Sequence, residues 1–219
     1  MTSLLNLSQQ NGIFNAETAT HVTVIGVGAV GGYVVHGLAK QGVTGITVFD
    51  HDFVESHNFP MSIYRPRDLA RPKVDALKEI VEDATGVVIE TRNVKYEGQP
   101  LKGVVIACVD TMEARKVIWQ TIKQSPLIRV PILLDTRVCA ELIWVFAIHP
   151  DDPDDEALYK HHLSYSSQET ASPTCGNHGI DYVSKRAAGI VQINLTQWWQ
   201  NGTKKILHKE VAGTLEVIE

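Results

Sequence analysis

The chain has 219 residues, a formal net charge of −5 at pH 7 and 44% hydrophobic residues, which suits one globular domain with a substantial core. Its slight acidity and scattered basic residues argue against a nucleic-acid partner. No apolar run approaches the roughly 20 residues that cross a bilayer, and the first residues do not read as a signal peptide, so we expect a cytoplasmic protein without membrane contact.

The first part of the chain predicts a βαβ unit. After a polar arm (1–20), residues 21–50 run from a β-branched stretch through a glycine-rich turn and a stretch of helical period into a second apolar run. A polar loop follows, Pro72 opens a predicted helix over 73–84, and a strand fits residues 87–94.

The second part continues the alternation of strands and helices. Residues 103–110 predict a buried strand, 111–123 an amphipathic helix, and 132–150 two further strands. Residues 151–174 are acidic and polar, and too long for an ordinary connection, which predicts a mobile functional loop. A helical period resumes over 178–199, and the end of the chain fits a final strand.

Three glycines predict a nucleotide site. Gly26, Gly28 and Gly31 stand between the first strand and its helix, where a tight turn lets backbone N–H groups approach a phosphate. Asp50 ends the second strand about twenty residues further on, and a carboxylate there hydrogen-bonds a ribose. These features predict a Rossmann-like α/β fold, a doubly wound, mostly parallel sheet with helices on both faces, in one domain over 21–219. A packing turn with a solvated aspartate is the alternative, and the motif does not separate ATP from a dinucleotide.

Two segments carry a family resemblance. One follows the second strand and the other ends the strand over 103–110; the matching positions are Asp50, Asp52, Val54, Asn58, Lys73, Asp110 and Arg115. Together they resemble the ThiF/MoeB family, which includes the ubiquitin-activating enzymes. The resemblance implies ATP and Mg²⁺, adenylation of the C-terminal carboxylate of a small ubiquitin-like or sulfur-carrier protein, and a homodimer. A conjugating enzyme stays open as a further partner.

The residue types suit this chemistry by themselves. Transfer of an adenylyl group expels pyrophosphate, so cations and amide donors must offset the charge of the triphosphate, and a carboxylate must hold Mg²⁺. Lys73 supplies the cation, Asn58 a neutral donor, and Asp110 a metal-directed carboxylate at the C-terminal end of a strand. The respective alternatives are a solvated lysine, a turn asparagine and an N-capping aspartate.

The sequence departs from the family where relatives carry a phosphate-binding arginine, which is Met61 here. Arg65, Arg67 or Arg71 can replace it, and we assign Arg65 to the nucleotide site. Relatives also supply an arginine from the arm of the neighbouring subunit, whereas residues 1–20 contain neither arginine nor lysine. These gaps put catalytic efficiency in question rather than the fold.

Arg137 lies on a strand that faces the activated tail in relatives. The resemblance assigns it to a phosphate or to the incoming carboxylate. A buried ion pair with Asp135 or Glu141 is the alternative.

Cys175 is the candidate nucleophile. It precedes the last predicted helix, where the ThiF branch of the family carries its reactive cysteine, and a helix N-terminus lowers a thiol pKa. Cys108 and Cys139 lie in apolar strands and read as small buried side chains. An unreactive Cys175 is the alternative, because some relatives only adenylate. The chain has no Cys-x-x-Cys pair, so zinc is not expected.

Two other classes of function use the same features. An NAD-dependent oxidoreductase needs the glycine turn and Asp50 but has no task for Lys73 or Asp110. A non-catalytic module of the same fold would bind a nucleotide or a protein tail without turnover, a hypothesis that Met61 and the arginine-free arm motivate. ATP-dependent adenylation accounts for the largest number of these residues together.

Overall fold

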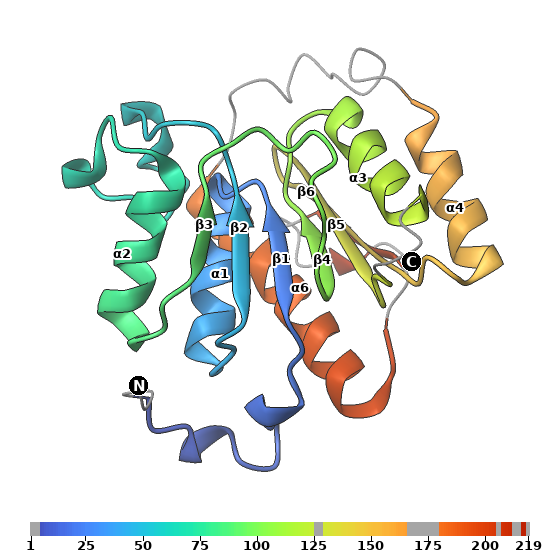
Figure 1. The fold of residues 1–219 in the computed structure, drawn as a ribbon, viewed down its shortest axis with the longest axis horizontal. Helices are drawn as coiled ribbons and strands as arrows, with labels where there is room; N and C mark the ends of the chain where they lie inside the picture. The colour runs from blue at the N-terminus through green and yellow to red at the C-terminus, as the bar shows by residue number, and fades with distance from the viewer. Residues whose placement is uncertain (1–4, 125–128, 166–179, 205–206, 212–215, 218–219) are drawn as a thin grey trace.

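A computed structural model describes residues 5–124, 129–165, 180–204, 207–211 and 216–217 (Figure 1). Its strands form one sheet in the order β3-β2-β1-β4-β5-β6-β7-β8. They are β1 Val22–Ile25, β2 Ile46–Phe49, β3 Glu90–Arg92, β4 Val104–Ala107, β5 Leu133–Cys139, β6 Leu142–Ile148, β7 Leu207–Val211 and β8 Glu216–Val217. The pairs from β3 to β5 are parallel, and β6, β7 and β8 each run antiparallel to the preceding strand.

Helices cover both faces of the sheet (Figure 1). They are α1 Ala29–Lys40, α2 Lys73–Thr85, α3 Met112–Gln124, α4 Pro153–Leu163 and α6 Asp181–Asn201. One hydrophobic cluster joins α1, α2 and α6 to the sheet, and a second joins α3 and α4 to its other face. The predicted Rossmann-like, doubly wound sheet with helices on both faces is therefore confirmed.

The central strands are short and apolar because both of their faces are covered. Every residue of β1, β2 and β4 is buried, as expected for parallel strands between two helical layers. Strand β1 lies between β2 and β4, so the chain builds the sheet in one direction as far as β3 and then returns to extend it in the other. In open α/β sheets, ligands bind at such a reversal, which here lies at the carboxyl ends of β1 and β4.

The loop expected over residues 151–174 is wrong for its first part, where α4 occupies Pro153–Leu163. Asp152 caps this helix by accepting hydrogen bonds from the backbone of Asp154 and Asp155. The helix buries only Asp155, Tyr159 and Leu163, which recur every fourth residue. Only two of these three are apolar, so the sequence shows almost no apolar stripe. Residues 166–174 lie outside the described part of the chain.

The N-terminal arm packs at the amino edge of the sheet. Residues 5–20 include two 3₁₀ turns, η1 Ser8–Gln10 and η2 Ala16–Thr18. Phe14 is buried and stacks on Trp199 near the end of α6, with 5.8 Å between ring centroids. The arm therefore joins the last long helix to the entry of β1.

Candidate functional site

The residues that follow the parallel strands lie together at the carboxyl ends of those strands. Gly26 follows β1, Asp50 follows β2 and Cys108 follows β4, and the strands are paired in register up to these positions. The backbone N–H of Gly26 donates to the Phe49 carbonyl, and that of Cys108 donates to the Ile25 carbonyl, both at 2.8 Å. The predicted glycine turn and Asp50 thus lie at the same end of the sheet.

The three motif glycines have different tasks. Gly26 has a positive φ of 86°, and a Cβ there would lie 2.5 Å from the Cys108 carbonyl oxygen. A Cβ on Gly31 would lie 2.0 Å from the Gly26 carbonyl oxygen. Gly28 precedes α1 and borders open space, since nothing lies within 4 Å of a Cβ built there. Two glycines are therefore required by packing, whereas Gly28 leaves the N-terminus of α1 open to a ligand.

Asp50 holds the glycine turn in place and is not a solvated aspartate. It is 9% exposed, and its Oδ2 accepts a hydrogen bond from the Val27 backbone at 2.8 Å while Oδ1 accepts one from Asp52 at 2.9 Å. Each oxygen keeps a second lone pair, which a ribose hydroxyl can use. The buried Tyr64 hydroxyl donates to the Val27 carbonyl at 2.5 Å. Nothing in the sequence around Tyr64 indicated this support.

Lys73 is nearly buried and pairs with Asp52. Its Nζ lies 2.8 Å from Asp52 Oδ2, with 11% of the lysine side chain and 52% of the aspartate side chain exposed. The Lys73 backbone N–H also donates to the Asp52 carbonyl at 2.9 Å. Burial alone would raise the pKa of Asp52, but the hydrogen bond and charge of Lys73 lower it overall. The solvated-lysine alternative does not hold, and Lys73 lies beside Asp52, whose backbone N–H donates to Asp50.

Asp110 is exposed and lies three residues beyond the end of β4, which stops at Ala107 rather than at the predicted residue 110. Thr111 rather than Asp110 caps α3, because its hydroxyl oxygen accepts a hydrogen bond from the Ala114 backbone at 3.2 Å. Among the described residues, Asp110 has neither a hydrogen bond nor an ion pair. A carboxylate with free lone pairs at this edge is suited to a hard cation such as Mg²⁺.

A second set of possible metal ligands, two carboxylates and a histidine, follows β2 and is less available. Ligand atoms of Asp50, His51 and Asp52 lie within 4.8 Å of one another. Asp50 already accepts two backbone N–H groups, and Asp52 is paired with Lys73. Asp110 is therefore the better candidate for a metal ligand.

Asn58 and Met61 lie in the loop between β2 and α2. Asn58 ends the 3₁₀ turn η3 Ser56–Asn58, where its Oδ1 accepts a hydrogen bond from the Glu55 backbone at 2.9 Å. Asn58 therefore stabilises the turn, as the alternative for this residue expects, and its side-chain amide nitrogen remains a candidate donor. Met61 is half-buried.

Arg65 is held by acidic side chains. Its Nε lies 2.9 Å from Oδ2 of the fully buried Asp68, and its NH2 lies 3.1 Å from Asp68 Oδ1 and 3.0 Å from Glu79 Oε1. Arg67 and Arg71 also contact Glu79. These contacts anchor the loop to α2, so none of the three arginines is an unengaged replacement for the cation missing at Met61.

Arg137 also pairs with an acidic side chain, which matches the alternative for this residue. Its Nε and NH2 lie 2.9 and 2.8 Å from Asp135 Oδ2, and its guanidinium stacks 4.6 Å above the Phe146 ring. Glu141 instead accepts a hydrogen bond from Tyr182. With 15% of its side chain exposed, Arg137 still reaches the surface near the sheet edge.

Cys108 and Cys139 are both half-buried, so both are less enclosed than expected. Burial raises the pKa of the Cys108 thiol to about 12, which disfavours the thiolate form that acts as a nucleophile. Cys175 lies outside the described residues.

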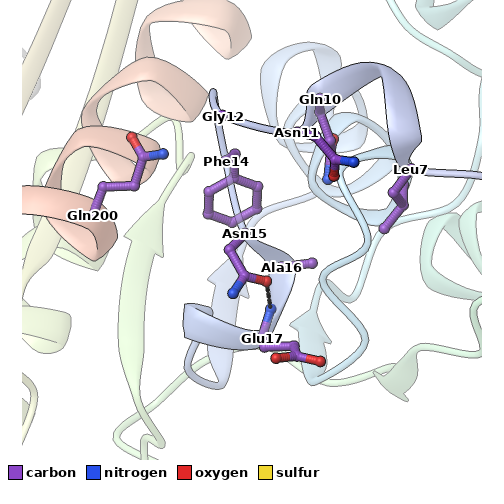
Figure 2. Close-up of a pocket in the computed structure, with 9 residues that line it drawn as sticks. All are labelled: Leu7, Gln10, Asn11, Gly12, Phe14, Asn15, Ala16, Glu17 and Gln200. Carbon is purple, nitrogen blue, oxygen red and sulfur yellow. Dashed lines mark hydrogen bonds between the residues drawn. The ribbon is translucent and has the colours of Figure 1, made fainter.

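A hollow lies towards the amino ends of the parallel strands, between the arm and α6 (Figure 2). It measures ≈ 370 Å³ and is lined by Leu7, Gln10, Asn11, Gly12, Phe14, Asn15, Ala16, Glu17 and Gln200. None of the predicted site residues lines it, and its amides and single carboxylate indicate no catalytic group.

Comparison with known families decides the classification. The model of the ThiF family matches residues 5–210. The chain belongs to the ThiF family. In this ThiF protein, no described helix has the length and apolar character needed to cross a membrane.

Curated relatives match part of the chain. Molybdopterin-synthase adenylyltransferase of Haemophilus influenzae is 27% identical over 151 residues, which cover 65% of this chain and 61% of the relative. Ubiquitin-like modifier-activating enzyme 5 of Caenorhabditis elegans is 30% identical over 115 residues, 44% of this chain and 27% of the relative. The ThiF chain thus spans less than two thirds of the length of either relative.

Solved structures share the fold. E. coli MccB with AMPCPP and MccA aligns with a TM-score of 0.71 at 11% identity, covering 93% of this chain and 64% of the MccB chain. PaaA aligns with a TM-score of 0.69 at 17% identity, with the same coverages. At such low identity, these structures support the arrangement of strands and helices alone.

Proposed function

We propose that this chain binds ATP with Mg²⁺ and adenylates the C-terminal carboxylate of a small ubiquitin-like or sulfur-carrier protein. The observation that carries the proposal is Asp110, whose exposed carboxylate has no partner among the described residues and shares a sheet edge with the open N-terminus of α1. A dinucleotide needs no carboxylate there.

Four residues divide the binding of the nucleotide. Gly28 lets the first amides of α1 approach the phosphates, and Asp50 offers acceptors to the ribose. Lys73 turns from Asp52 towards the triphosphate, and Asp110 holds Mg²⁺, which neutralises part of the phosphate charge when bound. Lys73 exchanges one anionic partner for another, so its charge remains paired throughout.

The proposed reaction transfers an adenylyl group from ATP to the carrier carboxylate. A carboxylate oxygen of the carrier forms a bond to the α-phosphorus of ATP, the bond from that phosphorus to the bridging oxygen breaks, and pyrophosphate leaves with the electron pair. Lys73 lies near the developing negative charge and stabilises it. Asn58 contributes a neutral donor. We keep Arg137 as the group that meets the incoming carboxylate, since 15% of its side chain remains exposed.

A second step is proposed at Cys175. Its thiolate attacks the acyl carbon, a carbon–sulfur bond forms, the bond to AMP breaks, and the thiol proton passes to solvent. Cys175→Ala should keep ATP–pyrophosphate exchange and lose a thiol-sensitive adduct with the carrier. Cys108→Ala is the matched control. An adduct that persists in Cys175→Ala would contradict the thioester step.

The curated relatives support this class of substrate. Their names describe an adenylyltransferase for molybdopterin synthase and an activating enzyme for a ubiquitin-like modifier. We infer a protein or peptide tail as the acceptor. A homodimer is part of the same proposal, and light scattering at micromolar concentration tests it, a monomer being the contrary result.

The test is exchange of labelled pyrophosphate into ATP, with and without Mg²⁺, against a panel of small ubiquitin-like proteins that end in glycine. Asp110→Asn should reduce Mg²⁺-dependent exchange by roughly 100-fold or more while leaving the melting temperature unchanged. Arg129→Ala, which alters an exposed ion pair with Asp151, is the control. Near-normal exchange in Asp110→Asn would remove this residue from the site. Binding of ATP without exchange would indicate a non-catalytic module.

A further inference from the structure

Arg115 bridges the two residues on either side of Asp110. It lies near the start of α3, and only 5% of its side chain is exposed. Its NH1 donates to the Thr111 carbonyl at 3.1 Å, and its NH2 donates to the Val109 carbonyl. A single planar guanidinium therefore fixes the backbone before and after Asp110.

Strand β5 holds this guanidinium in turn. Arg115 NH2 also donates to the Thr136 carbonyl at 3.1 Å, and Nε donates to Asp135 Oδ1 at 2.9 Å. Asp135 is fully buried. Burial alone would raise the pKa of this carboxyl, but Arg115 and Arg137 lower it overall, so Asp135 remains charged. Separating such a buried pair is costly, which keeps the arginine in one orientation.

The second oxygen of Asp135 is fixed as well. Oδ2 accepts hydrogen bonds from Arg137 Nε at 2.9 Å and from the buried Tyr159 hydroxyl at 3.1 Å. Tyr159 belongs to α4 and Arg137 to β5, so the carboxylate is held from two elements other than α3. Its position does not depend on Arg115 alone.

We propose that Arg115 and Asp135 are positioning residues for Asp110. Asp110 has no hydrogen bond of its own among the described residues, so the backbone that carries it determines where its carboxylate lies. A metal ligand held in one place binds its ion more tightly than a mobile one, because less ordering accompanies binding. The inference rests on the proposed function, since it takes Asp110 as the carboxylate that holds Mg²⁺.

Two variants separate the bridge from the charge pair. Arg115→Lys keeps a positive charge beside Asp135 but lacks the fork that reaches several acceptors at once. Asp135→Asn keeps the size and one acceptor oxygen of the side chain but loses its charge. The control is Asp155→Asn, which removes the charge of another buried carboxylate; Asp155 pairs with Lys204 at 2.5 Å near the start of α4.

The first measurement uses the ligand-free chain. In the unmodified chain, ¹⁵N order parameters for the amides of Val109, Asp110 and Thr111 should be near 0.85, the range of a rigid backbone. In Arg115→Lys and Asp135→Asn they should fall to about 0.6 or below. The glycine turn serves as the internal reference and should not change. Asp155→Asn should leave all of these values as they are.

The second measurement is calorimetric titration with ATP at a series of Mg²⁺ concentrations. The Mg²⁺ concentration that gives half of the metal-dependent gain in ATP affinity should rise about 10-fold in Arg115→Lys and in Asp135→Asn, and not in Asp155→Asn. ATP affinity without Mg²⁺ should stay the same in all four proteins. A merely structural role would weaken both conditions equally.

The outcomes distinguish the inference from the function beneath it. Unchanged order parameters in Arg115→Lys overturn the bridge, and lowered order parameters with an unchanged Mg²⁺ requirement overturn its role at Asp110. If Asp135→Asn does not fold, Arg115→Lys decides both points. ATP binding that ignores Mg²⁺ in the unmodified chain overturns the proposed function, and the positioning role with it, even where the order parameters show that the bridge exists.

Discussion

Two groups of arginines in this chain differ in how completely acidic side chains neutralise them. In the loop before α2, three arginines face three carboxylates; they are Arg65, Arg67 and Arg71 against Asp68, Glu79 and Asp83. Where α3 packs on β5, Arg115 and Arg137 share the single carboxylate of Asp135. We call these the loop group and the sheet group. The loop group is balanced, whereas the sheet group keeps one excess positive charge.

The difference shows which cations remain available to an anionic ligand. An arginine bound bidentately to a buried carboxylate must leave that charge unpaired before it reaches a phosphate, which is costly. The loop group therefore stabilises the fold, and Lys73, whose partner Asp52 is half-exposed, is the cation that can exchange partners. The sheet group combines a structural bridge with positive charge near the expected carboxylate.

The largest expected effect comes from removing one cation of each kind, Lys73 or Arg65, by mutation. Lys73→Ala should lower ATP–pyrophosphate exchange by roughly 100-fold with little loss of stability, because it removes a charge that acts on the transition state. Arg65→Ala should lower the free energy of unfolding by about 2 kcal/mol, because Asp68 loses a charged hydrogen-bond partner, and leave exchange within a few-fold. Urea unfolding and exchange assays on both variants provide the check. A stable Arg65→Ala chain without exchange would mean that the loop group binds the nucleotide.

The pH dependence of stability sharpens the comparison. Burial alone would raise the pKa of Asp68, but hydrogen bonds from Arg65 and the charges of Arg65 and Arg71 lower it below its ordinary value of 3.8. The charged form therefore stabilises the fold above pH 3.8, and this contribution is lost as the pH falls through the lower folded-state value.

Asp68→Asn should accordingly be less stable than the unmodified chain at pH 6, by about 2 kcal/mol. The gap should narrow as the pH falls below 3.8. Urea midpoints at several pH values measure it. A gap that stays constant down to pH 3 would show that folding does not lower the pKa of Asp68.

Each group also lies beside a strained alanine, and here the smallest effect is expected. Ala70 has a φ of 61° next to Arg71, and Ala140 has a φ of 53° in the turn between β5 and β6. Glycine relieves the left-handed conformation, so Ala70→Gly and Ala140→Gly should each stabilise the chain by about 1 kcal/mol. Ala157→Gly, in the exposed middle of α4, should destabilise it by about 0.5–1 kcal/mol. Thermal melts distinguish the signs, and destabilisation at Ala140 would refute the strain.

How far the sequence predicts the site depends on the distance between partners. Gly26, Gly31 and Asp50 act within one βαβ unit, so spacing was enough to place them. Arg65 of the loop pairs with Glu79 of α2, and Arg115 of α3 pairs with Asp135 of β5. Such pairings depend on how the sheet and helices pack, which periodicity does not specify.

The prediction of a loop where α4 lies failed for a different reason. Its buried residues recur only every fourth position among charged neighbours. Asp152 followed by Pro153 is the helix-start signal that could have identified it. Asp110 shows a related ambiguity, since a strand-ending aspartate reads equally as a helix cap. Only the contact between Thr111 and Ala114 assigns the cap and leaves Asp110 free for a metal.

The most direct test of the account is the melting temperature of the chain with ATP, with ATP and Mg²⁺, and with NAD. A ligand that binds only the folded state raises this temperature in proportion to its free-energy gain. We predict that ATP with Mg²⁺ raises it, that NAD does not, and that Asp110→Asn removes the Mg²⁺-dependent part of the increase. Equal or greater stabilisation by NAD would contradict the assignment of this sheet edge to ATP.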